Sequence, residues 1–231
     1  MGNEWSMSSP PLPHSANPTT EGWRRILILL SVAAGMAYPL LDSRFGDPAD
    51  IVLKGLGVGA LALAALAAPR APWLAAIMAL GALGDVLLEL PGLFVAGGAA
   101  FAAGHGVGIT FYLRHRRIAP TIAARVAAVA LIGYGFAMPA LVLPAGMPNG
   151  ALTLYSVLLC GMAAAALLSG FPRRLATVGA LLFVASDTLL VMRLGGRLLG
   201  GAELHGLMVW YAYYLGQLLI FLSISQGARD V

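Results

Sequence analysis

Charged residues are scarce in this chain of 231 residues: they make up 10% of it, while hydrophobic residues make up 59%. The mean hydropathy is +0.85. Soluble domains carry about 25% charged residues, so this composition excludes an ordinary water-soluble fold. It is typical of a polytopic membrane protein, in which most of the chain lies within the bilayer.

Cysteine is almost absent as well. Cys160 is the single cysteine and lies within the apolar run LYSVLLCGMAAAALL, which excludes an intrachain disulfide and a multi-cysteine metal site. The net charge of +4 comes from basic residues spread over short loops rather than gathered on one amphipathic face. We therefore expect a lipid bilayer, and no nucleic acid, as the surroundings of this protein.

The apolar residues form long windows that are separated by short turn-forming segments such as DSRFGDP and PAGMPNG. A bilayer core needs about twenty apolar residues per helix. This pattern predicts an all-α polytopic membrane protein with eight transmembrane helices, inside a transmembrane domain at 23–227. The windows are roughly 25–41, 51–68, 72–90, 97–113, 120–143, 151–168, 174–193 and 206–225.

The two ends of the chain differ from this pattern. Residues 1–22 are rich in Pro, Ser and Thr and hold no apolar core, which predicts a disordered tail. Residues 228–231 are a short C-terminal tail. Ten basic residues fall on the side of both termini and four on the other, so the positive-inside rule places both termini in the cytoplasm. The ten are Arg24, Arg25, Arg70, Arg114, Arg116, Arg117, Arg125, Arg173, Arg174 and Arg229, and the four are Arg44, Lys54, Arg193 and Arg197.

An internal repeat joins the two halves of the chain. GMAYPLL at 35–41 is echoed by GFAMPALVL at 135–143, and GALGDVLLEL is echoed by LFVASDTLLVM, which aligns Asp85 with Asp187. The offsets between these equivalents range only from 100 to 103. Four helices separate equivalent positions, so the pattern indicates two parallel four-helix repeats with both aspartates at matching depth.

Asp85 and Asp187 are the two carboxylates that need an explanation. A carboxylate at the centre of a membrane helix costs about 2.5–3.5 kcal/mol, so we expect both to face the bundle interior. If they meet there, one holds a proton while its partner stays ionised, which makes an acid–base pair. A structural alternative is that each hydrogen-bonds a neighbouring helix. Glu89, one turn after Asp85, lies where it either takes part or reaches the membrane interface.

Four further polar residues are candidates for binding a substrate. His105 lies in the middle of FAAGHGVGITFYL and needs a polar partner at that depth. Tyr214 and Gln217 are three positions apart on one face of the last window. Lys54 either snorkels to the surface or reaches inward as a cation. A zinc site from His105, His205 and an aspartate is conceivable, although no close-spaced ligand pair supports it.

These residues together resemble the YhhN family of membrane proteins, which includes the lysoplasmalogenases. The resemblance rests on LGDVLL in the third window, FAAGH in the fourth, ASDTLL in the seventh and YYLGQLLI in the eighth, and it covers about residues 25 to 225. It implies that Asp85 and Asp187 are catalytic and that His105, Tyr214 and Gln217 belong to the site. The chain departs from the family's pattern at Gly55 and Gly108, where members often have proline and tyrosine.

The activity implied by the resemblance is hydrolysis of the vinyl-ether bond of a lysoplasmalogen to a fatty aldehyde and a glycerophospho-choline or -ethanolamine. A vinyl ether reacts by protonation at its β-carbon, after which water captures the oxocarbenium ion. The reaction needs an acid, a stabilising anion and a base, and no metal or other cofactor. The substrate would be a lysophospholipid whose phosphate Lys54 or nearby arginines hold.

Two other functions stay open on the sequence alone. A proton-coupled transporter of a small molecule or lipid also uses mid-membrane carboxylates in duplicated halves, and Pro39 and Pro139 are hints of the broken helices found in such carriers. A zinc-dependent lipid hydrolase is the third possibility. In each case we expect an integral protein of a bacterial inner membrane.

Overall fold

The structure, a computed structural model, describes residues 18–41, 47–68, 70–147, 150–171 and 173–227, and these form eight α-helices. Each helix is long and apolar enough to cross a membrane. The predicted all-α fold with eight transmembrane helices is therefore confirmed, and the protein is an integral membrane protein. The helices are α1 (Pro18–Leu41), α2 (Asp47–Ala65), α3 (Ala71–Glu89), α4 (Phe94–Arg114), α5 (Ile122–Val142), α6 (Gly150–Leu168), α7 (Arg173–Leu194) and α8 (Gly201–Ser225).

Most helix ends agree with the predicted windows, and the largest differences are at the starts of α1 and α8. Helix α1 begins at Pro18, inside the segment predicted as a tail, because proline fits the first turn of a helix and Glu21 follows in that turn. Helix α8 begins at Gly201, since its polar first turn continues directly into the apolar window. The predicted tails at residues 1–17 and 228–231 lie outside the described residues.

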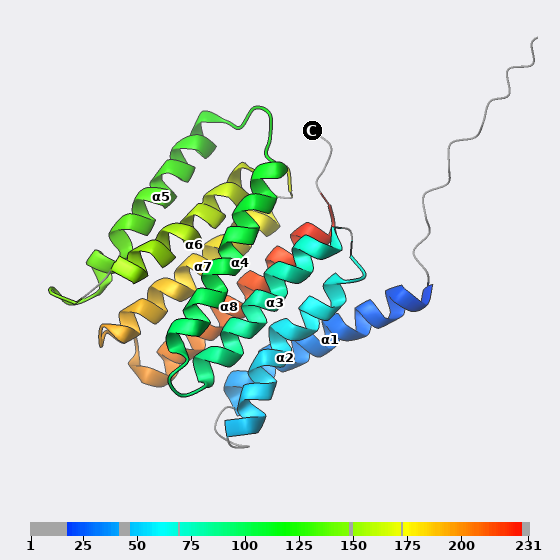
Figure 1. The fold of residues 1–231 in the computed structure, drawn as a ribbon, viewed down its shortest axis with the longest axis horizontal. Helices are drawn as coiled ribbons and strands as arrows, with labels where there is room; N and C mark the ends of the chain where they lie inside the picture. The colour runs from blue at the N-terminus through cyan, green and yellow to red at the C-terminus, as the bar shows by residue number, and fades with distance from the viewer. Residues whose placement is uncertain (1–17, 42–46, 69, 148–149, 172, 228–231) are drawn as a thin grey trace, which may run out of the picture.

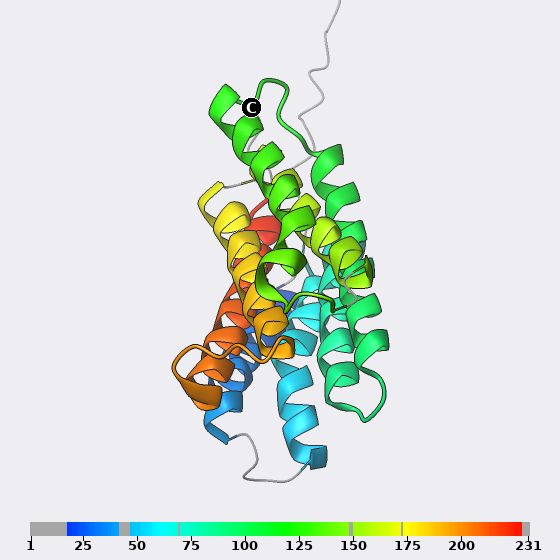
Figure 2. The same ribbon diagram turned by 90° about the vertical axis from the view of Figure 1, so that its left-hand side faces the viewer.

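Successive helices pack side by side within each half, α1 to α4 and α5 to α8, whereas α4 and α5 do not contact each other, and α1 and α5 lie on opposite sides of the bundle (Figure 1). Helix α8 contacts α1, α2, α3 and α7, while α5 covers α6 and α7 (Figure 2). The large apolar side chains of α5 point outward, with Ile122 80% and Val129 70% exposed. Such a helix has to face lipid, since apolar surface of this extent is not stable in water.

Most of the contacts between helices follow the repeat. In the repeat, α2 is equivalent to α6 and α4 is equivalent to α8. The contact between α2 and α8 therefore corresponds to the contact between α6 and α4. The contacts α1–α2, α2–α3 and α3–α4 likewise match α5–α6, α6–α7 and α7–α8. These pairings agree with two parallel four-helix repeats. Helices α1 and α5 both continue past their prolines, Pro39 and Pro139, without a break.

The ends of the bundle are closed by short connections. At the end where α4 finishes and α5 starts, Arg116 forms an antiparallel bridge with Ser169 of the α6–α7 connection. The backbone N–H of Gly170 also donates to the carbonyl of His115 at 2.8 Å. The segment that joins the two repeats is therefore tied to the second repeat.

Candidate active site

Asp85 lies on the face of α3 that is turned toward α8 and is 2% exposed. The hydroxyl of Tyr213 donates a hydrogen bond to its Oδ2 at 2.7 Å. The amide Nε2 of Gln217, one turn further along α8, donates to the hydroxyl oxygen of Tyr213 at 3.4 Å. Gln217, Tyr213 and Asp85 thus form one chain of donors that ends on the carboxylate.

Asp187 on α7 is 5% exposed and has a different tyrosine as its partner. The hydroxyl of Tyr155, on α6, donates to Oδ2 of Asp187. The charges of Asp85 and Asp187 are close enough to act on each other, and Tyr155 is also within electrostatic range of Asp85. The structure therefore brings both predicted aspartates, each with its own phenol, into one interior.

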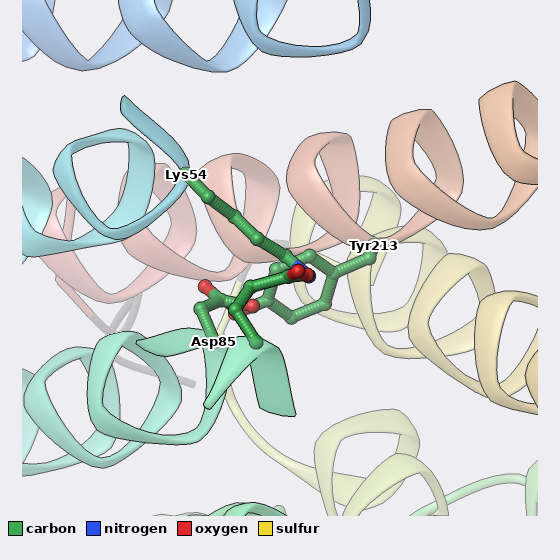
Figure 3. A network of polar contacts seen from close by, with 4 residues as sticks. Lys54, Asp85 and Tyr213 are labelled. Atoms are coloured by element: carbon green, nitrogen blue, oxygen red, sulfur yellow. The ribbon is translucent and has the colours of Figure 1, made fainter. Parts of the chain in front are cut away.

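Lys54 of α2 reaches toward Asp85 and Tyr213 (Figure 3). Its ammonium forms an ion pair with Glu89 and lies 5.7 Å and 5.8 Å from the ring centroids of Tyr38 and Trp210. Its charge also acts on Asp85. Glu89 is therefore the partner of Lys54 and not of Asp85, even though both acids lie on one face of α3. The side chains of Lys54 and Glu89 are 14% and 36% exposed, so this pair lies at the edge of the interior.

Lys54 and Tyr155 occupy equivalent places in the two repeats, because they are 101 positions apart in the chain. Each extends from the second helix of its repeat toward the aspartate on the third helix. The two halves thus have the same acid at equivalent positions but give it a different neighbour.

His105 of α4 is buried, with its ring 5.6 Å from that of Tyr155 and 4.9 Å from that of Phe183. It lines a cavity of about 20 Å³ that is enclosed by α3, α4, α6, α7 and α8. Gln217 lines the same cavity. Two predicted site residues, His105 and Gln217, thus line one cavity, and Gln217 is connected through Tyr213 to a third, Asp85.

Two of the residues singled out in the sequence lie elsewhere. The hydroxyl of Tyr214 is 3.0 Å from Oγ of Ser31 on α1. His205 is in the first turn of α8, where Nδ1 accepts from the N–H of Leu199 at 3.1 Å and Nε2 donates to the carbonyl of Leu189 at 2.9 Å. Both ring nitrogens of His205 thus bind backbone, and it anchors the α7–α8 connection.

The conceivable zinc site is not assembled in the part of the chain that the structure describes, where no three His, Cys, Asp or Glu side chains gather as ligands. Cys160 is buried in α6, where it packs among the apolar side chains of the core.

The sequence did not single out the two tyrosines that bind the aspartates. One signal was available for each. Tyr213 is one full turn from Gln217, and Tyr155 is the repeat equivalent of Lys54.

The profile of the YhhN family matches residues 49–224 of this chain, which include α3, α4, α5, α6 and α7 and most of α2 and α8. The chain belongs to the YhhN family. Proteins named lysoplasmalogenase from Mycobacterium bovis and Mycobacterium tuberculosis are each 34% identical to it over 185 residues, which cover 74% of this chain and 68% of the relative. No solved structure matches the chain.

Membership of the YhhN family agrees with the resemblance carried by LGDVLL and ASDTLL, and it directs attention to one of the departures. Gly108, where members often have tyrosine, lines the cavity beside His105, and a Cβ there would lie 3.0 Å from Cγ of Met162. Because Gly108 has no Cβ, the space that a side chain would fill there is part of the cavity.

Proposed function

We propose that the protein hydrolyses the vinyl-ether bond of a lysoplasmalogen within the membrane and releases a fatty aldehyde and a glycerophospho-base. The observation that carries the proposal is the presence of two buried aspartates, one from each repeat, in a single interior. Membership of the YhhN family and two relatives named lysoplasmalogenase support the substrate class.

The two carboxyl groups have complementary roles in this reaction. One protonated carboxyl donates its proton to the β-carbon of the alkenyl chain, and the other, ionised carboxylate stabilises the oxocarbenium ion and takes a proton from the attacking water. The hemiacetal then collapses to the aldehyde and the free hydroxyl of the glycerol. A phenol on each carboxylate holds one oxygen in place and leaves the other for proton transfer.

The lipid is bound with its headgroup at the Lys54 end of the site. Lys54 is the basic side chain whose charge acts on Asp85, and an ammonium is a good partner for phosphate. A cavity of about 20 Å³ is too small for an acyl-length chain, so the alkenyl chain enters sideways between helices and its vinyl ether reaches the aspartates from the Lys54 side.

The test is aldehyde release from an alkenyl-lysophospholipid by the purified protein and its Asp85→Asn and Asp187→Asn variants. Each amide keeps the shape of the side chain but neither donates nor accepts a catalytic proton, so we expect about 10²–10⁴-fold slower release. Glu203→Gln, an exposed position in the first turn of α8, is the control and retains the full rate. The proposal is contradicted if neither the wild-type protein nor the Glu203→Gln control releases aldehyde. It is also contradicted if both aspartate variants keep full activity.

Two further arms of the same experiment address the alternatives. The matched aspartates of a parallel repeat also support a proton-coupled carrier, which would show substrate-driven proton uptake into liposomes and no aldehyde. A zinc-dependent hydrolase would lose its activity on incubation with EDTA. The proposed aspartate mechanism retains it.

A further inference from the structure

Three side chains that line the cavity each hold a buried polar atom without a hydrogen-bond partner among the described residues: Nε2 of His105, the hydroxyl of Tyr112 and Oε1 of Gln217. Their side chains are 3%, 0% and 2% exposed. An unpaired polar atom at such depth costs about 1–3 kcal/mol, and here three of them line one space. A polar ligand in the cavity would give such atoms a partner.

The size and lining of the cavity select that ligand. About 20 Å³ accommodates one water molecule, and a buried water needs two to four polar partners. The rest of the lining is apolar and excludes a larger polar ligand, with Ile77, Phe101, Met162, Phe183 and Ile220 as its main members.

The three atoms also match the donors and acceptors of a water molecule. The amide of Gln217 is oriented by the bond from its Nε2 to Tyr213, so Oε1 is the atom that accepts in the cavity. With Nε2 of His105 unprotonated, water donates to these two atoms and accepts from the hydroxyl of Tyr112. One lone pair of the water stays unused, which is the requirement for a nucleophile.

The cavity lies next to both aspartate–tyrosine pairs. Gly81 and Phe183, which line it, are one turn before Asp85 and Asp187 on α3 and α7. We infer that this cavity is a binding site for the hydrolytic water, which it delivers to the oxocarbenium ion. The inference rests on the proposed function.

The step balances without any further reactant. After the β-carbon has been protonated, the water oxygen forms a bond to the oxygen-bearing carbon of the cation, and its proton passes to the ionised carboxylate. The resulting hemiacetal loses the glycerol oxygen as a hydroxyl, which takes back a proton, and the aldehyde is left. If the water is missing, the cation can only return its proton and re-form the vinyl ether.

The choice between capture of the cation by water and return of its proton can be measured by deuterium exchange. A purely structural role of Tyr112 would not change this partition. In D₂O the wild-type protein forms deuterated aldehyde, and the recovered lipid carries no deuterium. In Tyr112→Phe we expect aldehyde release to fall about tenfold, since one hydrogen bond to the water is lost, and deuterium to accumulate at the vinyl β-carbon of the recovered lipid. The ratio of exchanged lipid to aldehyde does not depend on how much protein is folded.

Tyr211→Phe is the matched control, because it removes a hydroxyl that donates to the carbonyl of Met36 at 3.1 Å, outside the cavity. It should behave as wild type in both readouts. A Tyr112→Phe protein with an unchanged rate, or with a slower rate and no deuterium in the recovered lipid, overturns the inference. If the wild type releases no aldehyde from any vinyl-ether lipid, the proposed function itself fails.

A second measurement needs no substrate. Radiolysis in H₂¹⁸O makes hydroxyl radicals from bound water, and these oxidise methionine sulfur nearby. Met162 lines the cavity and is 4% exposed, whereas Met138 is 1% exposed and outside it. We expect oxidation of Met162 but not of Met138, and less of it in Tyr112→Phe. Equal protection of both methionines would show that the cavity holds no water and would overturn the inference.

Discussion

Each buried aspartate accepts a hydrogen bond from one tyrosine, and that phenol decides how the carboxylate is held in an apolar interior. Tyr213 and Tyr155 come from different helices, α8 and α6, so the two carboxylates are oriented independently of each other. A carboxylate without such a donor would rotate and would bear its full desolvation cost. The tyrosines are therefore positioning residues of the proposed reaction.

We expect Tyr213→Phe and Tyr155→Phe each to lower kcat for aldehyde release by about tenfold and to leave KM nearly unchanged. The lost bond is worth about 1–1.5 kcal/mol net, and the headgroup contacts at Lys54 are not involved. Steady-state kinetics in detergent would measure both constants, with Tyr211→Phe as the control. A rise in KM without a change in kcat would show that the tyrosines bind the lipid instead.

At the scale of helices, the sequence predicts the number, order and approximate ends of the elements well. Long apolar windows between turn-forming segments have few other structures available to them in a membrane. The rotation of each helix about its own axis is much harder to predict. Tyr213 and Tyr214 are adjacent, yet one contacts Asp85 on α3 and the other contacts Ser31 on α1.

The reason for this difficulty is physical. In a soluble protein a polar face shows which side of a helix is buried, but α8 is apolar nearly all round, so its rotation is set by packing against α7 and α3. The repeat places Asp85 and Asp187 at one depth because depth follows from counting residues. The partners of the aspartates depend on contacts between helices that no local pattern records.

The packing of α7 on α8 itself depends on two glycines. A Cβ on Gly216 would lie 2.8 Å from the carbonyl oxygen of Gly179, and a Cβ on Gly179 would lie 2.8 Å from that of Gly216. Gly216→Ala therefore forces the helices apart and shifts Tyr213, three residues away. We expect a loss of about 1–3 kcal/mol in stability, seen as a lower Tm in detergent, together with reduced aldehyde release.

Gly133→Ala on α5 is the control for this experiment, because a Cβ there meets no atom within 4 Å. It should keep the Tm of the wild type or raise it slightly, since alanine favours a helix. If Gly216→Ala were as stable as Gly133→Ala, close packing of α7 on α8 would not be needed for the fold.

At the scale of the whole molecule, most of the basic residues of the chain lie toward one end of the bundle, in helix ends and connections. Arg70 of the α2–α3 connection lies 5.5 Å from the ring of Phe171, and Arg114 at the end of α4 lies 4.8 Å from that of Trp73. The positive-inside rule predicts that this basic end faces the cytoplasm and that Lys54 and Glu89 lie toward the opposite side of the membrane.

The orientation can be tested with introduced cysteines, since the natural Cys160 is buried and gives little background. Met147 and Ile118, at opposite ends of the bundle, are 40% and 95% exposed. A membrane-impermeant maleimide added to intact cells should label Met147→Cys and not Ile118→Cys, and both should react after the membrane is permeabilised. The reverse pattern would place both termini outside.

The repeat equivalence of Lys54 and Tyr155 has a consequence for how duplication can produce catalysis. Copying a four-helix unit yields two identical acids, and in a symmetric pair nothing fixes which acid donates the proton and which accepts it. The chain breaks this symmetry at one position of the unit, where one copy has a cation and the other a phenol. Exchanging the side chains of Lys54 and Tyr155 would thus test whether the aspartate that donates the proton and the aspartate that accepts it can swap roles while the fold stays the same.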